Sequence, residues 1–543
     1  MLSEPASKNM QDYLLSGKRL KQDQYSNDGN TKLNSNVTIT DDDVFLYNSD
    51  ANIEKNLDDV LNIIHYHETY IANKYTIKRD YYKGRHRGII NQPDKEMNKP
   101  DNRLIFNFPK KLVNTFNGYF SGEPVAIKYQ TDSDTDSSTD ALNKQIQSWL
   151  NDNDYADVFS EWSKQADIYG RSYLRLYQVN SAINMTVCSP RDTIVVYDDS
   201  VEHKPICAIR YSTSLIEGTL ITPTRDYQFE QQTGKGASGL QYTNVETDDD
   251  GKQLVQSQDV HTFPILPVIE LEEDDERTGI FDDVISLIDA IDSVQSAKDN
   301  DISAFSNEYM VVKGQKLTAE QVKDIIDNRL INLYQTNKAS FNANNPIQPS
   351  VEFLTPDSND ETQEHFLDRV IDQVYQISQV VNLNDSNFGM SAQSISGVAL
   401  LQRYQPMQAK ARTKALKMDK ALRQVFTILF ANWGNGAQIS DLTFDHKQSI
   451  PHNALEEAQT VATLDGQVSD VTKLGFLSGI DDPQKEVDRL DKQNKDNEQH
   501  AQELAKQYLP DQQNGGVNDD NNQSGAPTDK STNQPGQSDG QTE

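Results

Sequence analysis

Three short clusters of histidine and acidic residues have side chains that could bind a divalent metal ion. His65-Tyr-His67-Glu68 lies in a segment with helical spacing, where residues two apart point away from each other, so we expect a plain helix surface. Asp41-Asp-Asp43 lies in a polar segment and is interpreted as a solvated charge run. Asp198-Asp199 follows a predicted strand, where a turn is the simpler interpretation. The sequence therefore predicts no metal site.

Other patterns for chemistry are incomplete. Gly234-Lys-Gly236 lacks the spacing and the Lys-Ser/Thr ending of a phosphate-binding loop. There is no Gly-x-Ser-x-Gly motif, and Cys188 and Cys207 lie in no nucleophile motif. We therefore expect no catalytic residue, no cofactor and no enzymatic activity.

Two predicted helices carry one-sided charge. The helix over about 280–305 places four carboxylates away from its apolar stripe: Asp282, Asp289, Asp292 and Asp299. That face is either an ordinary solvated surface or a functional acidic wall. The helix over 397–433 carries a basic stripe: Lys410, Lys414, Lys417, Lys420 and Arg423. The stripe could contact phosphate, but pairing with carboxylates of neighbouring elements or subunits is favoured because acidic residues are in surplus.

The composition narrows the class of protein. The 543 residues include 83 Asp and Glu against 51 Lys and Arg, giving a formal charge of −32. Such a charge argues against a general nucleic-acid binder, whose affinity comes mostly from Lys and Arg. No stretch approaches the roughly 18 apolar residues of a membrane span, and the N-terminus has no apolar signal segment. With two cysteines, a reducing compartment is expected.

The first half of the chain has mixed local patterns. Residues 1–55 and 511–543 are low in complexity and are expected to be mostly disordered. Helical spacing predicts helices over 56–75, 104–118 and 154–169. Strands are predicted over 125–130, 173–179, 185–187, 193–197 and 206–212, with loops at 131–140 and 231–258.

The second half is organised around long helices. The helix over 280–305 is followed by a small mixed insert with strands predicted over 309–312, 331–334 and 351–354 and a helix opening at 318. A second long helix carries an apolar stripe of Phe366, Val370, Val374, Ile377 and Val381. A polar stretch then leads to a third helix, in which Pro406 predicts a kink. A strand over 442–446 and helices over 454–464, 468–474 and 483–509 complete the pattern.

Several motifs follow one another in a recognisable order. They are Asn102-Arg103 with Asn107-Phe108, Gly118-Tyr-Phe-Ser-Gly-Glu-Pro-Val125, Tyr169-Gly170, Ser189-Pro-Arg-Asp192, Pro267-Val-Ile-Glu270, Phe281 to Asp289, Ser396-Gly-Val-Ala-Leu400, Ser469 to Leu474 and Asp482-Pro-Gln-Lys-Glu486. With the order of long helix, insert, long helix, polar loop and kinked helix, the chain resembles the portal proteins of tailed bacteriophages. The closest likeness is to the large portal family of siphophages of Gram-positive bacteria, over about residues 56–500.

The resemblance implies a mainly helical α+β fold with the portal domains, assembled as a ring. In this sequence those domains are an N-terminal arm at 1–55, wing 56–278, first stem helix 279–308, clip 309–356, second stem helix 357–382, tunnel loop 383–396, kinked tunnel helix 397–433, return strand 434–450, helical crown 451–510 and acidic tail 511–543.

The resemblance also implies a function and partners. About twelve subunits would form a channel for double-stranded DNA at one capsid vertex of the virion, after assembly in the host cytoplasm. The partners would be the terminase large subunit, head-completion or adaptor proteins, and the major capsid and scaffold proteins, with no membrane. The clip would dock partners through Glu320, Lys323, Asp324, Asp327 and Arg329.

The tunnel loop would be the narrowest DNA contact, through neutral donors and two apolar side chains rather than cations. Its residues are Asn384, Asp385, Ser386, Asn387, Phe388, Met390, Ser391 and Gln393. The acidic face of the first stem helix would line the channel and repel DNA at short range. Two alternatives stay open: an acidic scaffold or interaction protein, and a metal-dependent nuclease.

Overall fold

The computed structural model describes residues 30–96, 99–130, 137–212, 216–232, 239–305, 310–313, 318–320, 322–323, 350–353, 360–382, 397–448, 454–477, 479–480 and 483–508. The chain divides into two compact units, residues 1–450 and 451–543. Among the described helices, none combines the length and the apolar character that a membrane crossing needs.

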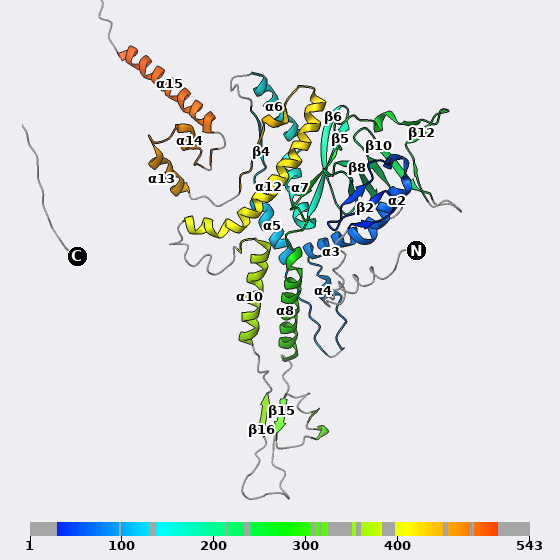
Figure 1. Cartoon of the computed structure of the whole chain (residues 1–543). Coiled ribbons are helices and arrows are strands. Elements are labelled where there is room, and N and C mark those ends of the chain that lie inside the picture. The colour runs from blue at the N-terminus through cyan, green and yellow to red at the C-terminus, as the bar shows by residue number, and fades with distance from the viewer. Residues whose placement is uncertain are drawn as a thin grey trace, which may run out of the picture. The chain divides into compact units, whose positions relative to one another are not determined.

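An eight-stranded sheet forms one side of the wing (Figure 1). Its neighbours are antiparallel except β3 and β7, which pair in parallel with Phe45 opposite Val196. In spatial order the strands are β1 (Thr31–Lys32), β2 (Val37–Ile39), β3 (Phe45–Tyr47), β7 (Thr193–Asp198), β8 (Pro205–Ser212), β9 (Glu217–Ile221), β10 (Asp226–Gln231) and β11 (Leu240–Tyr242).

The N-terminal arm is a correction to the sequence prediction. Residues 31–47 were expected to be mostly disordered, yet they form β1 to β3, and Val37, Ile39 and Tyr47 are at most 1% exposed. The segment is short and polar overall, but its few apolar residues alternate into the core of a sheet completed 150 residues later in the chain.

Smaller sheets complete the wing. One has the order β14 (Val268–Glu272), β5 (Arg171–Val179) and β6 (Ala182–Cys188). The others are the pairs β4 (Ala126–Tyr129) with β17 (Leu442–Asp445) and β12 (Val245–Thr247) with β13 (Gln253–Val255). The predicted strands of the wing are confirmed, whereas the predicted loop at 231–258 contains β11 to β13.

The wing helices are α2 (Leu57–Tyr66), α3 (Ala72–Tyr82), α4 (Arg87–Ile90), α5 (Phe108–Phe120), α6 (Ser137–Asp152) and α7 (Tyr155–Tyr169). A π-helical turn, η3 (His67–Ile71), joins α2 to α3, and short 3-10 turns are η2 (Ile53–Lys55), η4 (Ser257–Asp259) and η6 (Ile439–Asp441). Part of α6 falls in the predicted loop at 131–140, which is therefore too long. Gly170 ends α7 with φ +90°, and a Cβ there would lie 1.8 Å from the Arg277 carbonyl oxygen.

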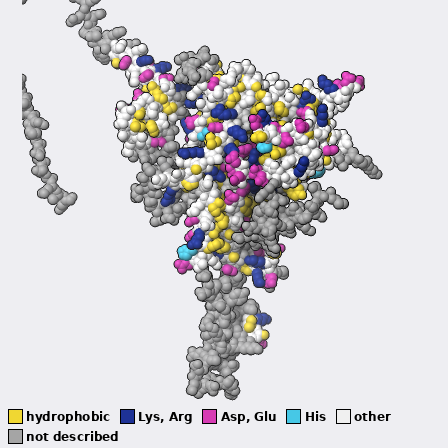
Figure 2. All heavy atoms as spheres, in the orientation of Figure 1, with side chains coloured by type: hydrophobic (Ala, Val, Ile, Leu, Met, Phe, Trp, Pro, Cys, Tyr) yellow, Lys and Arg dark blue, Asp and Glu magenta, His cyan; other side chains and the backbone are white. Residues whose placement is uncertain are grey.

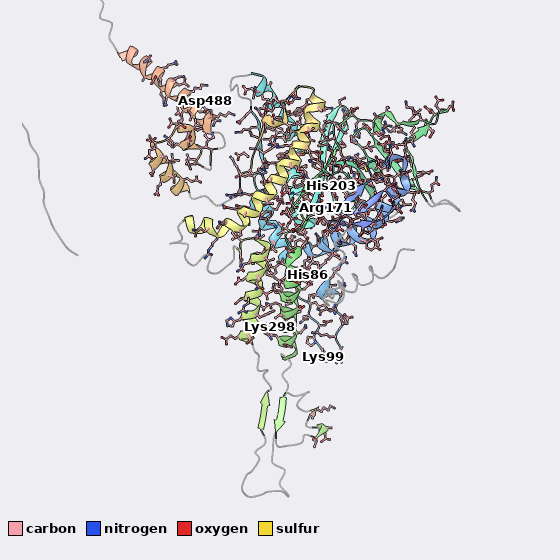
Figure 3. All side chains as sticks on the ribbon, viewed as in Figure 1. His86, Lys99, Arg171, His203, Lys298 and Asp488 are labelled. Carbon is pink, nitrogen blue, oxygen red and sulfur yellow. The ribbon has the colours of Figure 1, made fainter. Side chains whose placement is uncertain are left out.

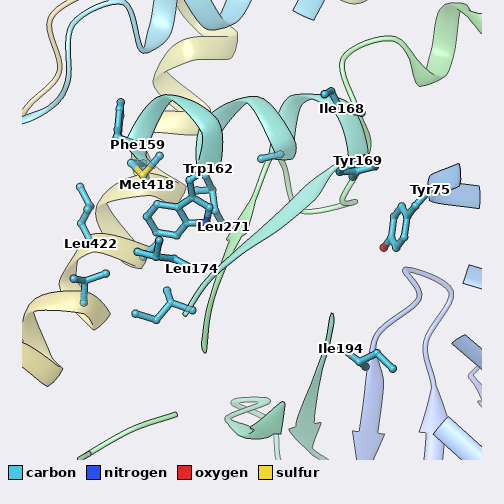
Figure 4. Packing of buried hydrophobic residues seen from close by; sticks show 14 of the residues in the cluster. Tyr75, Phe159, Trp162, Ile168, Tyr169, Leu174, Ile194, Leu271, Met418 and Leu422 are labelled. Atoms are coloured by element: carbon cyan, nitrogen blue, oxygen red, sulfur yellow. The ribbon is translucent and has the colours of Figure 1, made fainter. Parts of the chain in front are cut away.

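The wing core lies where α7 and the tunnel helix, α12 (Gly397–Trp433), both pack against the three-stranded sheet (Figure 4). Trp162 is 1% exposed and lies beside Leu174 and Leu271 of the sheet. Met418 and Leu422 close this core from α12. The tunnel helix is therefore part of the wing core as well as a continuation of the stem.

The stem is a pair of helices below the wing (Figure 1). A 3-10 turn, η5 (Asp282–Val284), leads into α8 (Ile285–Phe305), which lies beside α10 (Asp360–Ser378). Between them, β15 (Met310–Lys313) pairs with β16 (Ser350–Phe353), as predicted. The predicted strand at 331–334 lies outside the described residues.

Of two expectations about the long helices, the one about the apolar stripe of α10 is corrected and the one about Pro406 is confirmed. The apolar stripe of α10 is narrower than predicted, because Val370 and Val374 are buried while Phe366 and Ile377 are 47% and 48% exposed. Pro406 lies inside α12 as predicted, and the ribbon changes direction along this helix (Figure 1).

The second unit contains α13 (Ala454–Leu464), α14 (Asp470–Leu474) and α15 (Pro483–Tyr508), close to the predicted crown helices. Ser469 caps α14, because its hydroxyl accepts a hydrogen bond from the Thr472 N–H. Lys473 Nζ lies 2.6 Å from Asp465 and 2.8 Å from Asp470, which ties α14 to the preceding turn.

Candidate functional site

The carboxylates predicted to form one acidic face at the head of the stem are instead held inside the chain. Asp282 accepts from Lys78 Nζ at 2.5 Å and from the Gly279 N–H at 2.6 Å. Burial raises the pKa of Asp282, although Lys78 opposes the shift. Asp282, at the start of the first stem helix, therefore links this helix to α3 through an ion pair with Lys78.

Asp289 and Asp292 lie about two and three turns beyond Asp282 on α8 and face the segment around α4. The Tyr81 hydroxyl donates to Asp289, at 2.9 and 3.0 Å from its two oxygens. His86 Nδ1 lies 2.5 Å from Asp292 Oδ2, and the Phe106 N–H donates to Asp292 Oδ1 at 2.8 Å. His86 and Asp292 are both 0% exposed, so Asp292 cannot repel DNA as a channel wall.

The lower half of α8 holds the segment that precedes α5. Ser296 Oγ accepts from the Leu104 N–H at 2.9 Å, and Asn300 exchanges hydrogen bonds with the backbone of Asn102. Asp299 lies on the same half and is partly exposed. These contacts correct the predicted acidic face, because three of its four members turn toward α3 and α4 rather than toward solvent.

The middle of the tunnel helix is fixed to the wing by a buried ion cluster. Lys414 is 0% exposed and contacts Asp167 of α7 and Glu273, the latter at 2.9 Å. Its ammonium also donates to the Ser163 carbonyl at 3.1 Å. Burial raises the pKa of Asp167 well above its ordinary value, even though Lys414 opposes the shift. One cation thus faces two buried carboxyl groups, and burial favours the protonated form of Asp167.

Other cations of the basic stripe also have partners inside the chain. Lys417 pairs with Glu272 at 3.0 Å and also contacts Asp275, and Lys420 lies 4.0 Å from Glu272. Arg423 donates to the Ile439 carbonyl and lies over the Phe444 ring, and Lys410 is partly exposed. The favoured interpretation, pairing with carboxylates of neighbouring elements, is confirmed for Lys414, Lys417 and Lys420.

A second buried ion network lies at the edge of the three-stranded sheet. Arg277 Nε contacts Glu270 at 3.0 Å, and Arg171 Nε lies 3.7 Å from the same carboxylate. Arg171 also reaches the carbonyls of Asp42 and Asp43, which ties the N-terminal strands to β5. Burial alone would raise the pKa of Glu270, but Arg277 and Arg171 outweigh it and lower the value to about 2.

The second stem helix presents two different exposed flanks. At 3.6 residues per turn, the exposed Phe366 and Ile377 fall on one side of its buried stripe. The opposite flank is acidic and carries Glu361, Glu364, Asp368 and Asp372, all of them exposed. Glu364 contacts Lys298 of α8, so this flank continues toward the first stem helix. Hydrophobic side chains gather over the stem below the wing (Figure 2).

The family model described as "Phage portal protein, SPP1 Gp6-like" matches residues 61–500, which is most of the chain. The chain belongs to the phage portal protein family. The family, the portal fold class and the structural rather than enzymatic role expected from the sequence are thereby confirmed.

Solved structures of phage-like particles are similar to this portal protein. A chain from the neck of an empty gene transfer agent (GTA) particle, computed with C6 symmetry, is 12% identical, with TM-score 0.38 and coverage of 69% of this chain and 90% of that one. A chain from the native GTA virion is 12% identical, with TM-score 0.39 and the same coverage. A chain from the neck of a native GTA particle, computed with C12 symmetry, is 12% identical, with TM-score 0.37 and coverage of 74% of this chain and 93% of that one. A search of curated proteins finds no significant match.

The predicted binding residues of the portal are only partly described. The tunnel loop from Asn384 to Gln393 lies outside the described residues, as do Asp324, Asp327 and Arg329 of the clip. Glu320 and Lys323 are described and exposed. The clip and loop assignments therefore stay predictions.

The three clusters considered for metal binding have ordinary partners. His65 is exposed, whereas His67 is buried, with Nδ1 2.9 Å from the Tyr211 hydroxyl and Nε2 3.1 Å from the Pro190 carbonyl. Asp43 pairs with Lys74 at 2.7 Å. Asp198 accepts from Ser200 and from the Lys204 N–H, which confirms the predicted turn.

Sequence reasoning missed the partners of the buried ions. Asp167, Glu273, Lys78, Tyr81 and His86 come from elements far from α8 and α12 in the chain, and none lies in a recognisable motif. The signal that the sequence offered was the surplus of acidic residues, which favoured pairing of the α12 cations with carboxylates of neighbouring elements.

Proposed function

We propose that this portal protein assembles into a closed ring of about twelve subunits that conducts double-stranded DNA during packaging and ejection. The observation that carries the proposal is the portal family match over residues 61–500, joined to the order of stem helix, insert, stem helix and bent tunnel helix. The role at one capsid vertex, with virion location and prior assembly in the host cytoplasm, follows from this assignment.

The ionic joints support a rigid conduit. A subunit that bears on moving DNA must transmit load from the tunnel helix to the wing without repacking. Lys414 and its two carboxylates fasten α12 to α7 and to the end of β14, while Lys78 and Asp282 fasten α3 to the head of α8. A fully buried ion cluster thus joins the tunnel helix to the wing, and a partly buried ion pair joins the wing to the head of the stem.

The surface that repels DNA is better placed on the second stem helix. Asp289 and Asp292 are engaged inside the chain, whereas Asp368 and Asp372 of α10 are exposed along one flank. In a ring, each such carboxylate becomes a circle of charge that repels phosphate within the roughly 8–10 Å screening length. We assign the acidic flank of α10 to the channel and the loop at 383–396 to the narrowest DNA contact.

The insert between the stem helices is the proposed docking site. Its exposed Glu320 and Lys323 offer both charge signs to a partner, first the terminase large subunit and then head-completion proteins. The wing and crown would meet the major capsid and scaffold proteins.

Negative-stain microscopy and native mass spectrometry of the purified full-length chain test the ring. We expect a closed ring with an axial hole and no DNA cleavage in Mg²⁺ or Mn²⁺. A protein that stays monomeric under all assembly conditions would support the acidic scaffold alternative. Cleavage that is lost on changing one carboxylate would support the nuclease alternative. Either result would overturn the proposal.

A further inference from the structure

A compact group of metal-ligand types lies where the segment around α4 meets the first stem helix (Figure 3). One ligand atom each from His86, Asp289 and Asp292 lie within 4.8 Å of one another. One imidazole and two carboxylates form a mixed nitrogen and oxygen donor set suited to Zn²⁺ and related divalent ions. His86 and Asp292 are fully buried, which separates this cluster from an exposed acidic patch.

The outer contacts of the cluster resemble those that orient metal ligands. The Tyr81 hydroxyl donates to Asp289, and the Phe106 N–H holds Asp292 by the oxygen that does not face His86. The Tyr81 ring also stacks on the His86 ring, with centroids 4.7 Å apart and planes within 15°. Such partners fix ligand geometry before an ion binds.

His86 meets the carboxylates through Nδ1, which lies 2.5 Å from Asp292 Oδ2. A ring nitrogen binds a metal ion through its lone pair, so Nδ1 is the atom that would bind an ion held together with Asp289 and Asp292. The other ring nitrogen, Nε2, is buried and has no hydrogen-bond partner among the described residues.

The charge of the cluster favours a cation as well. Within the described part of the chain, no Lys or Arg comes within 4.0 Å of Asp289 or Asp292. Other buried carboxylates of this protein, such as Glu270 and Glu273, have such a partner. Two carboxyl groups and an imidazole without a neighbouring Lys or Arg form a donor set whose charge a divalent ion would balance.

We propose that His86, Asp289 and Asp292 bind one divalent transition-metal ion, with Zn²⁺ as the best-fitting probe, and that this ion fastens the α4 segment to stem helix α8. The inference does not depend on ring formation. A bound ion would replace the proton between His86 and Asp292 and draw the third ligand, Asp289, into the same shell.

The test uses the full-length chain, treated with a chelator and then equilibrated with Zn²⁺ or Mn²⁺. We expect about one Zn²⁺ per chain by elemental mass spectrometry after gel filtration, with a higher melting temperature than the metal-free chain. His86→Ala and Asp289→Asn should each remove this stoichiometric binding. Tyr81→Phe keeps all three ligands and should weaken binding about 10–100-fold.

Matched controls keep the result interpretable. His65→Ala removes an exposed histidine, and Asp299→Asn removes a partly exposed carboxylate of the same helix, so both should bind as the parent does. If circular dichroism shows that His86→Ala is unfolded, the isosteric Asp289→Asn variant decides. Absence of stoichiometric Zn²⁺ and Mn²⁺ binding, or parental affinity in Asp289→Asn, would overturn the proposal.

Discussion

At the scale of single residues, the buried ammonium of Lys414 organises the junction between tunnel helix and wing. It contacts two carboxylates and a carbonyl, and it lies 5.4 and 5.2 Å from the ring centroids of Phe116 and Phe120. Breaking a buried pair from one side is costly because the remaining charges stay desolvated.

Lys414→Met should therefore lower the free energy of unfolding by about 3–5 kcal/mol. Asp167→Asn mimics the protonated carboxyl that burial favours and should cost no more than about 1 kcal/mol. Denaturant unfolding followed by circular dichroism measures both variants. Equal losses in the two would contradict the raised pKa of Asp167.

Glu270 makes a pH-dependent contribution to stability, and its pKa is shifted in the opposite direction to that of Asp167. Its pKa is lowered from 4.5 in the unfolded chain to about 2 in the folded one. The ionised carboxylate therefore stabilises the fold fully above pH 4.5, and this contribution is lost as pH falls toward 2. The stability difference between the parent and Glu270→Gln should shrink across that window. A difference that stays constant with pH would argue against the two-arginine network.

Single-residue roles were the least predictable part of the site. Internal pairing of the α12 cations could be favoured from the surplus of acidic residues in the composition. The acidic residues of α8 were misassigned because helical spacing shows which residues share a face but not what covers it. Tyr81 and His86 lie about 200 residues away in the chain, and a sequence pattern carries no record of that contact.

At the scale of elements, the second stem helix, α10, carries an apolar flank and an acidic flank on different sides. Phe366 and Ile377 leave large apolar surfaces exposed on α10 of the single chain. In the proposed ring, such a flank is where a neighbouring subunit's stem would bury it.

Phe366→Asp with Ile377→Asp should thus reduce the yield of closed rings at least tenfold while the far-ultraviolet spectrum stays unchanged. Asp368→Asn changes an exposed residue of the opposite flank and serves as the control. Size-exclusion chromatography with light scattering gives the readout. Normal ring yield in the double variant would place the subunit contact elsewhere.

Element types were largely predictable, because the long helices have clear periodicity and Gly170 ends α7 where expected. The errors have one physical source. The segment 31–47 and the hairpin around β12 and β13 gain their strand structure from partners rather than from their own composition. Burial of Val37 and Ile39 in a sheet depends on β7, which no local window contains.

At the scale of the whole molecule, a formal charge of −32 per chain fits the proposed DNA conduit better than a DNA-binding protein. About twelve copies would carry on the order of −400, a self-repulsion that counterions and the contacts between subunits must offset. Lys414 and Lys417 of the basic stripe are engaged in ion pairs inside the subunit, so they are not available to DNA.

Asp368→Lys with Asp372→Lys should accordingly slow DNA passage without harming assembly, because a cationic ring binds phosphate with an affinity that rises with each contact. We expect at least a tenfold drop in packaged heads at low salt, partly recovered at higher salt. The charge-neutral Asp368→Asn variant should package normally. Full packaging by the lysine variant would show that this flank does not face the channel.

The most direct test of the DNA-conducting ring is a cryo-electron microscopy map of the assembled portal with DNA in its channel. The account predicts a closed ring whose axial density for duplex DNA comes closest to the loop at 383–396, with the acidic flank of α10 facing the channel below the wing. A map with no axial DNA, or with another segment nearest the duplex, would contradict it.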